Sequence, residues 1–269
     1  MKSNKKSSRG IKGVFSAAVI PTALVVSILV YVFVFGDGAN FVGGNNANVP
    51  LPGNYYGIIY KGGPIVPIII TLLLTVLAFG VERFLAINKA AGKGKVISFV
   101  ADINAKLDAG KIDEAKAACN TQKGSVANVI YSGLTKYQEM EREKTLPKDQ
   151  KLVSIQKEIE EATSLELPAL EQNLVVLSTI ASVATLMGLL GTVIGMIKAF
   201  SALANAGAPD SVQLAAGISE ALINTALGIG TSAFAIIFYN FFTTKIDKLT
   251  YSIDEAGFTI VNTFAAKNN

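Results

Sequence analysis

Hydroxyl, amide and carboxyl side chains recur at helical spacing within two of the most apolar segments of the chain. The first set has intervals of 4, 3 and 7 residues and consists of Ser178, Ser182, Thr185 and Thr192. The second set consists of Glu220, Asn224 and Thr231, with Thr225 beside them. Helical periodicity places each set along one face of its helix. Polar groups inside a membrane are costly and often line an ion pathway, so we interpret the two sets as a candidate polar pore face.

The depths of these side chains can be estimated from the rise of an α-helix. Counted from Leu174 and from Phe242, Thr192 lies about 27 Å and Thr225 about 26 Å above the inner end of its helix, and Glu220 lies at about 33 Å, near the outer edge of the hydrocarbon layer. The two threonines are therefore predicted at one level. Two other interpretations stay open: the hydroxyls bond only to backbone carbonyls one turn earlier, or Glu220 is solvated by water and headgroups.

Small residues accompany the polar ones in the same two segments. Lipid gives no hydrophobic drive for helices to associate, and small residues let their backbones approach closely. The glycines that we expect at the contact are Gly188, Gly191 and Gly195 on one helix and Gly217 and Gly228 on the other. Tight packing of these two helices is predicted.

The composition indicates the elements that hold these residues. The chain has 269 residues, of which 51% are hydrophobic and 16% charged, too few charges for an ordinary soluble domain. Uncharged runs long enough to cross a membrane occur at 14–35, 64–81, 174–196 and 222–242. The first run is longer than the core of a signal peptide and no A-x-A-like site follows it, so we expect an uncleaved helix.

The distribution of Lys and Arg predicts the orientation. Basic residues precede the first run and crowd the segment between the second and third, whereas the other two connections carry few charges. The positive-inside tendency places both termini and the large middle segment in the cytoplasm. The predicted layout is a tail and extra transmembrane helix (1–36), a periplasmic loop (37–63), a second span (64–87), a cytoplasmic helical domain (88–170), a third span (171–200), a periplasmic loop (201–211), a fourth span (212–243) and a cytoplasmic C-terminal helix (244–269).

The fold class that follows is an all-α integral membrane protein with four transmembrane helices, some of which extend into a cytoplasmic helical domain. Apolar stripes predict helices over 96–107, 112–119 and 126–137, and Gly110 ends the first of them. The segment 152–165 is predicted to start a helix that continues into the third span, and the stripe over 246–264 prolongs the fourth span. The stretch 38–60 has no periodicity and predicts an exposed loop. Each stripe could pack within the monomer or against another subunit.

The side chains that usually hold metals or perform covalent catalysis are scarce. The chain has no histidine and a single cysteine, Cys119, so the usual ligands of zinc and haem and the usual Cys/His bases are lacking. We expect no metal, no cofactor, no enzymatic activity and no nucleic-acid partner.

Two long stretches of sequence resemble one family. GLLGTVIGMIKAF and, after a short loop, GISEALINTALGIGTSAFAIIFYNFF resemble the signature of the ExbB, TolQ and MotA proton-channel family, and most closely ExbB. The resemblance continues through LPALEQNLVVLSTIASVA, VERFLAINKA, KIDEAKAAC and GSVANVIYSGL and covers about residues 64–250.

The resemblance implies a multi-pass stator of the inner membrane. Several copies, five by the family pattern, would surround the single transmembrane helices of an ExbD-like dimer among membrane lipids, and a TonB-like protein would transmit the energy. The family's pore-lining threonines match Thr192 and Thr225, and its membrane glutamate matches Glu220. In such motors the aspartate that cycles its proton belongs to the partner.

Two departures and several alternatives accompany the resemblance. The common layout has three spans and an outside N-terminus, and many relatives have Ala-Pro where this chain has Ala184 and Thr185. A TolQ-like envelope motor is the nearest alternative, a MotA-like flagellar stator a more distant one. A passive scaffold and a secondary transporter are alternatives of other classes. The residues do not distinguish H⁺ from Na⁺ as the driving ion.

Overall fold

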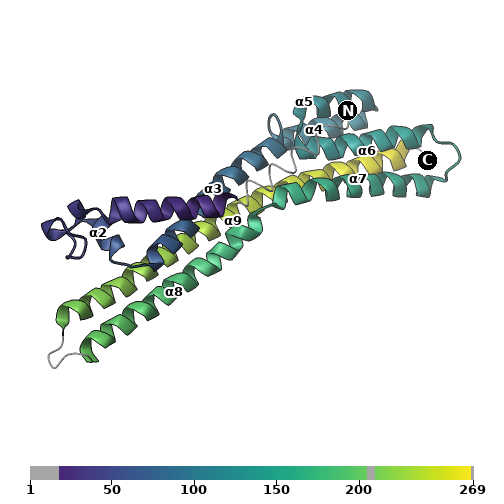
Figure 1. The fold of residues 1–269 in the computed structure, drawn as a ribbon. Helices are drawn as coiled ribbons and strands as arrows, with labels where there is room; N and C mark the ends of the chain where they lie inside the picture. The colour runs from purple at the N-terminus through teal and green to yellow at the C-terminus, as the bar shows by residue number, and fades with distance from the viewer. Residues whose placement is uncertain (1–17, 205–209, 268–269) are drawn as a thin grey trace. The chain divides into compact units, whose positions relative to one another are not determined.

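The long elements of the chain are helices (Figure 1). The computed structural model describes residues 18–204 and 210–267. The elements are η1 Val30–Phe35, η2 Gly38–Asn40, η3 Val42–Gly44, α2 Tyr55–Tyr60, α3 Ile65–Ala91, α4 Val96–Asp108, α5 Ile112–Gln122, α6 Gly124–Arg142, α7 Lys148–Glu171, α8 Leu174–Ala204 and α9 Ser211–Lys267. The predicted all-α fold is confirmed, because no strand longer than an isolated bridge occurs in the described ranges.

Four helical segments are long and apolar enough to cross a membrane. Each overlaps one of the predicted uncharged runs: Ala18–Phe35, Ile65–Asp108 (α3 and α4), Lys148–Ala204 (α7 and α8) and Ser211–Lys267 (α9). The start of the first predicted run (residues 14–17), the basic N-terminal cluster and residues 205–209 of the predicted loop 201–211 lie outside the described residues. Residues 201–204 of that loop belong to α8. The sides of the membrane on which the connections lie stay a prediction.

The chain divides into two compact units. The first unit comprises Met1–Val81 and Val175–Tyr239, and the second unit comprises Glu82–Leu174 and Asn240–Asn269. Helices α3, α8 and α9 each contribute residues to both units. Helix α9 contains both the fourth span and the C-terminal helix, which confirms the predicted continuation.

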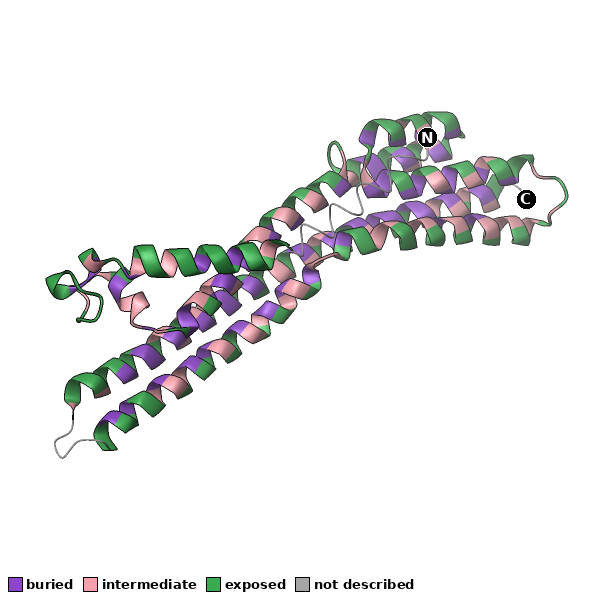
Figure 2. Cartoon of the chain, in the orientation of Figure 1, coloured by how far each residue is buried: buried purple, intermediate pink, exposed green. Residues whose placement is uncertain are grey.

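In the first unit, the helix Ala18–Phe35 ends in the π-helical turn η1 and exposes most of its apolar surface (Figure 2). It contacts α3 through a hydrogen bond of 2.7 Å between the hydroxyls of Ser27 and Thr71, and Ser27 is fully buried there. A buried polar pair of this kind fixes the register of two apolar helices that lipid alone would not hold together. The sequence did not predict this packing site.

The segment after this helix is more ordered than the exposed loop that the sequence predicted. It contains η2, η3 and α2, and Asn40 is buried, where its side-chain nitrogen donates to the carbonyls of Val34 (2.7 Å) and Phe35 (3.1 Å). The Asn40 oxygen accepts from the Asn54 amide at 3.0 Å. These hydrogen bonds join residues far apart in the segment, and they produce no periodicity that sequence patterns detect.

The second unit has a core of large side chains, built from the predicted stripes. The helices over 96–107, 112–119 and 126–137 are confirmed as α4, α5 and α6, and Gly110 adopts a positive φ of 75° after α4. The buried stripe residues are Phe99, Val100, Ile103, Leu107, Val126, Ile130, Leu134, Tyr137, Ile246, Leu249, Ile253, Ile260 and Phe264. These stripes therefore pack within the chain.

The prediction of a continuous helix from 152–165 into the third span is wrong. Helix α7 ends at Glu171, Asn173 adopts a left-handed φ of 67°, and α8 begins at Leu174. Asparagine tolerates this conformation better than most residues. The break leaves carbonyls at the end of α7 without helical partners, and a side chain from α3 satisfies them.

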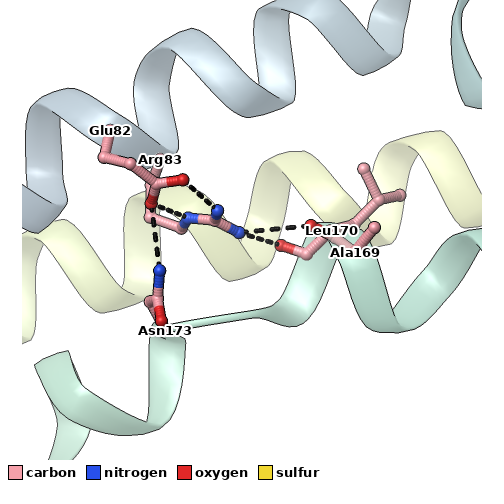
Figure 3. Close-up of polar contacts among 5 residues, drawn as sticks. All are labelled: Glu82, Arg83, Ala169, Leu170 and Asn173. Carbon is pink, nitrogen blue, oxygen red and sulfur yellow. Dashed lines mark hydrogen bonds and ion pairs between the residues drawn. The ribbon is translucent and has the colours of Figure 1, made fainter. Parts of the chain in front are cut away.

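That side chain is Arg83, which is 1% exposed (Figure 3). Its guanidinium donates to the carbonyls of Ala169 (3.3 Å) and Leu170 (3.1 Å) and pairs with the carboxylate of Glu82. The Asn173 amide donates to the same carboxylate at 3.3 Å. The buried charge is thus compensated by an anion and two carbonyls, the condition under which a charge is tolerated in a protein interior.

Candidate functional site: the polar seam between α8 and α9

Helices α8 and α9 pack backbone to backbone through their small residues. A Cβ built on Gly195 would lie 2.6 Å from the backbone nitrogen of Ala221, and one on Gly217 would lie 2.7 Å from that of Ala199. A Cβ on Gly228 would lie 2.7 Å from the carbonyl oxygen of Ala184 and from the Cα of Gly188. These distances are shorter than real Cβ contacts, so only glycine permits this approach.

The two helices meet in a line of polar residues that we call the polar seam, consisting of Thr192, Lys198, Glu220, Asn224 and Thr225. The hydroxyls of Thr192 and Thr225 are hydrogen bonded to each other, which confirms the prediction that they lie at one level. Each hydroxyl also lies within hydrogen-bond distance of the carbonyl one turn earlier, at 3.2 Å from Gly188 and 3.1 Å from Ala221. Both threonines are half-buried in the chain.

Glu220 lies at the end of the seam nearest the start of α9 and is 7% exposed. The Lys198 ammonium donates to both carboxylate oxygens, at 2.6 and 2.8 Å. A Cβ on Gly63 would lie 2.6 Å from Glu220 Oε1, and Gly63 has a positive φ of 75°. Glycine is therefore required there both by the backbone conformation and by the approach of the carboxylate.

Asn224 lies one turn further along α9 and is fully buried. Its side-chain nitrogen donates to the carbonyl of Gly62 at 2.8 Å, and a Cβ on Gly191 would lie 2.3 Å from the Asn224 Cβ. Gly191 thus makes room for Asn224, and Asn224 joins α9 to the turn before α3. The Asn224 side-chain oxygen has no hydrogen-bond partner among the described residues.

The other members of the predicted pore face do not lie together. Thr231 is 3% exposed, inside the chain, while Ser182 and Thr185 are exposed on α8. Ser178 donates to the Val175 carbonyl at 3.0 Å, the alternative role that the sequence left open. Within one chain, therefore, α8 and α9 contact each other through only part of the two polar sets. A pore-lining role for these four residues stays a prediction.

A cleft of about 1200 Å³ opens beside the Glu220 end of the seam. Its charged lining residues are Lys61, Lys198, Asp210 and Glu220, and the remaining lining comes mostly from small and apolar residues of 47–58 and 211–219. Burial lowers the pKa of the Lys61 ammonium below its ordinary value. The Lys61 ammonium donates to the carbonyls of Asn46 (2.9 Å) and Ala47 (3.0 Å).

Sequence patterns did not predict that Lys198 and the turn formed by Gly62 and Gly63 contact the polar residues of α9. Lys198 lies two residues beyond the uncharged run 174–196, so that run gave no reason to connect it with Glu220. A lysine and a glutamate near the ends of two consecutive antiparallel helices were the available signal. Among the residues that the structure describes, no group of three or more His, Cys, Asp or Glu is placed to hold a metal ion.

The polar seam lies in a region of the chain that matches a known protein family. The model of the MotA/TolQ/ExbB proton channel family matches residues 122–255, a segment that begins at the end of α5 and extends into α9. The chain belongs to this family. All five residues of the polar seam lie inside the match, whereas the helix Ala18–Phe35 and α3 lie outside it.

Individual relatives agree with the family. An ExbB-like biopolymer transport protein of Synechocystis sp. is 37% identical over 86 residues, 31% of this chain and 41% of that protein. TolQ of the Tol-Pal system of Pseudomonas aeruginosa is 26% identical over 183 residues, 66% of this chain and 79% of that protein. The biopolymer transport protein ExbB of Pseudomonas putida is 37% identical over 81 residues, 30% of this chain and 25% of that protein. The chain thus spans less than half of the length of the first and third relatives.

Family membership and the four apolar helical segments together make the chain a multi-pass membrane protein of a proton-channel family. The polar seam is its candidate functional site.

Proposed function

We propose that the chain is the ExbB-type stator subunit of an inner-membrane motor that couples the protonmotive force to transport across the outer membrane. Five copies would surround an ExbD-like dimer of single-span proteins, and a TonB-like protein would receive the motion. Both termini and the second unit would lie in the cytoplasm. The observation that carries the proposal is the hydrogen-bonded pair of Thr192 and Thr225, at one level of the two membrane helices that the family match covers.

The hydrogen-bond capacity of this pair suits a transient partner. Each threonine hydroxyl has one proton and two acceptor lone pairs. If Thr192 donates to Thr225, and Thr225 donates to the Ala221 carbonyl, both lone pairs of Thr192 remain able to accept. Rotation of the two O–H bonds reverses the direction and frees Thr225 instead. The pair can therefore accept a hydrogen bond from water or from a protonated carboxyl of the partner, without the cost of a buried charge.

The exposed faces of the first unit support an assembly. Large apolar side chains of α8 and α9 are exposed in the single chain, among them Leu186, Val193, Ile197, Phe234 and Ile237. Ser182 and Thr185 lie on the exposed surface of α8 as well. We propose that the apolar part of this surface contacts lipid and neighbouring copies, and that the polar part faces the partner helices.

The Thr192→Val, Thr225→Val double variant tests the ion-pathway role. Valine keeps the shape of threonine and removes the hydroxyl, so assembly should persist. Loss of one hydrogen bond worth about 1–1.5 kcal/mol in the conducting state slows ion-driven transport by about tenfold. The measurement is the rate of TonB-dependent substrate uptake in cells whose only copy is the variant.

Thr179→Val is the matched control, because Thr179 is exposed and, among the described residues, its hydroxyl donates to the Val175 carbonyl one turn earlier, at 2.7 Å. It should transport at the rate of the unaltered chain. A double variant that assembles and transports at the control rate would contradict the proposed role of the pair.

A TolQ-type subunit of an envelope-integrity motor is the second candidate, and the 183-residue alignment with a TolQ favours it. Native mass spectrometry of the detergent-extracted complex, expressed with its chromosomal neighbours, separates the two. We expect a ring of copies that holds two copies of a single-span protein, and a TonB-like neighbour. A TolA-like neighbour would favour the second candidate, and a monomer without a single-span partner would contradict both.

A further inference from the structure

The ion pair at the Glu220 end of the polar seam joins two residues of very different exposure. The Glu220 side chain is 9% exposed, whereas that of Lys198 is 50% exposed and lines the cleft. Both carboxylate oxygens of Glu220 accept from the same ammonium, at 2.6 and 2.8 Å. The buried partner is therefore held by the accessible one.

The other groups around Glu220 do not replace Lys198. Gly63 borders the carboxylate with its backbone and brings no charge. Tyr31 is in electrostatic range, but its hydroxyl donates to the Tyr60 carbonyl at 3.0 Å. Lys61 and Asp210 line the same cleft, and the Lys61 ammonium is directed to the carbonyls of Asn46 and Ala47. Lys198 is the cation that pairs with Glu220 among the described residues.

The position of Lys198 in the sequence also requires an explanation. It lies in α8 between Ile197 and Ala199, within a helix that is otherwise apolar at this end. A lysine near the end of a membrane helix can extend its ammonium to the aqueous interface. This one instead points to a carboxylate on the neighbouring helix, which is the arrangement expected when the cost of a buried carboxylate is offset by a tethered cation.

We propose that Lys198 is the built-in counter-ion of Glu220 and acts as a positioning residue that controls access to it. While the pair is closed, the ammonium occupies both oxygens, and Glu220 is available neither to a proton nor to a mobile cation. When the half-exposed lysine side chain moves into the cleft of about 1200 Å³, the carboxylate becomes available. The consequence for ion flow depends on the proposed function, whereas the pairing itself does not.

Carbodiimide labelling tests the availability of Glu220. Dicyclohexylcarbodiimide reacts with protonated carboxyl groups in apolar surroundings, and peptide mass spectrometry of the purified full-length complex locates the adduct. In Lys198→Met the buried carboxyl loses its cation and is expected to take up a proton. Labelling of Glu220 should then rise by about tenfold or more, since charge-assisted contacts that engage both oxygens are among the stronger ones. Lys198→Arg should stay protected, and Glu220→Gln gives the background.

A reciprocal measurement covers the case in which Lys198→Met does not fold. Glu220→Gln leaves no buried charge, and it releases the half-exposed ammonium of Lys198. Acylation of Lys198 by a water-soluble N-hydroxysuccinimide ester should become faster, while Lys61 in the same cleft should react at an unchanged rate. Equal labelling of Glu220 with and without the lysine, or an unchanged acylation rate of Lys198 in Glu220→Gln, would overturn the proposal.

The labelling results are separable from the proposed function, because they measure the chemistry of the pair and not ion flow. Equal labelling overturns the counter-ion role and leaves the stator proposal standing. Undiminished transport in the Thr192→Val, Thr225→Val variant contradicts the stator mechanism and leaves the labelling result unaltered.

Discussion

Different kinds of residue make the main contacts inside each of the two units. In the second unit the centre is filled by large side chains such as Leu134, Tyr137 and Phe264, each fully buried. In the first unit, glycines such as Gly195 and Gly217 bring the backbones of α8 and α9 together, and many large side chains of these two helices are exposed. Figure 2 shows the exposed residues along α8 and along the helix Ala18–Phe35.

We propose that the difference follows from the solvent, with lipid around the first unit and water around the second. In water, burial of apolar area drives helices together, so the largest apolar side chains turn inward. In lipid that drive is absent, and close backbone contact with interhelical hydrogen bonds replaces it. Large side chains can then face the lipid at no cost. The same residue type thus contributes differently to stability in the two units, and matched substitutions can measure this.

The largest expected effect is the loss of a large side chain from the second unit. Leu134→Ala removes a fully buried side chain of α6 and should lower the free energy of unfolding by about 2–5 kcal/mol. Leu186→Ala, on α8, removes a side chain that is 61% exposed and should change stability by less than about 0.5 kcal/mol. The free energy of unfolding of both variants is measured by guanidinium titration of the detergent-solubilised chain, with hydrogen exchange of α6 and α8 peptides as the readout. Equal losses would contradict the solvent argument.

Adding a side-chain atom at a glycine contact of the first unit should change the stability by an intermediate amount. Gly195→Ala adds a Cβ 2.6 Å from the Ala221 backbone nitrogen, and overpacking of this kind costs about 1–3 kcal/mol. Gly230→Ala is the control, because a Cβ there meets nothing within 4 Å and alanine favours the helix by about 0.5–1 kcal/mol. Thermal unfolding should therefore move in opposite directions in the two variants. A Gly195→Ala variant that is as stable as the unaltered chain, or more so, would show that the α8 to α9 contact tolerates a larger separation.

The parts of the fold that the sequence predicts are those with a helical period. The stripe that includes Ile103 and the one that includes Leu134 each predicted a helix and its buried face, because one side of each helix lies in a core. The break before α8 was missed, since it depends on the conformation of Asn173 and on Arg83, which lies far away in the sequence. No local pattern carries such a contact.

The candidate site was predictable to a similar extent. A constant rise per residue was enough to place Thr192 level with Thr225, because both helices are regular. Periodicity also put Asn224 on a polar face, but it could not show that this face is covered by the Gly62 turn of the same chain. The Lys198 to Glu220 pair depends on the side-chain conformation of a long lysine, which spacing does not determine.

A smaller destabilisation than that of Leu134→Ala is expected at Cys119, also in the second unit, and its pH dependence tests how well this core excludes water. Burial raises the pKa of the thiol from 9.0 to about 12 and outweighs a backbone hydrogen bond that lowers it. As the pH rises above about 9, the unfolded chain releases the proton first, so the thiol's contribution to stability is complete below that pH and is lost as the pH approaches 12. Cys119→Ala should cost only about 1 kcal/mol at pH 7, through the small cavity it leaves.

Unfolding of the unaltered chain and of Cys119→Ala, measured across the alkaline range, isolates the thiol from the lysines and tyrosines that both chains share. The stability difference between them should shrink above pH 9. Parallel profiles would mean that the thiol is accessible to water, and that the core of the second unit opens around α5 more readily than its fully buried leucines and isoleucines indicate. The contrast between the water-excluding core of the second unit and the glycine contacts of α8 and α9 would then hold for α6 but not for α5.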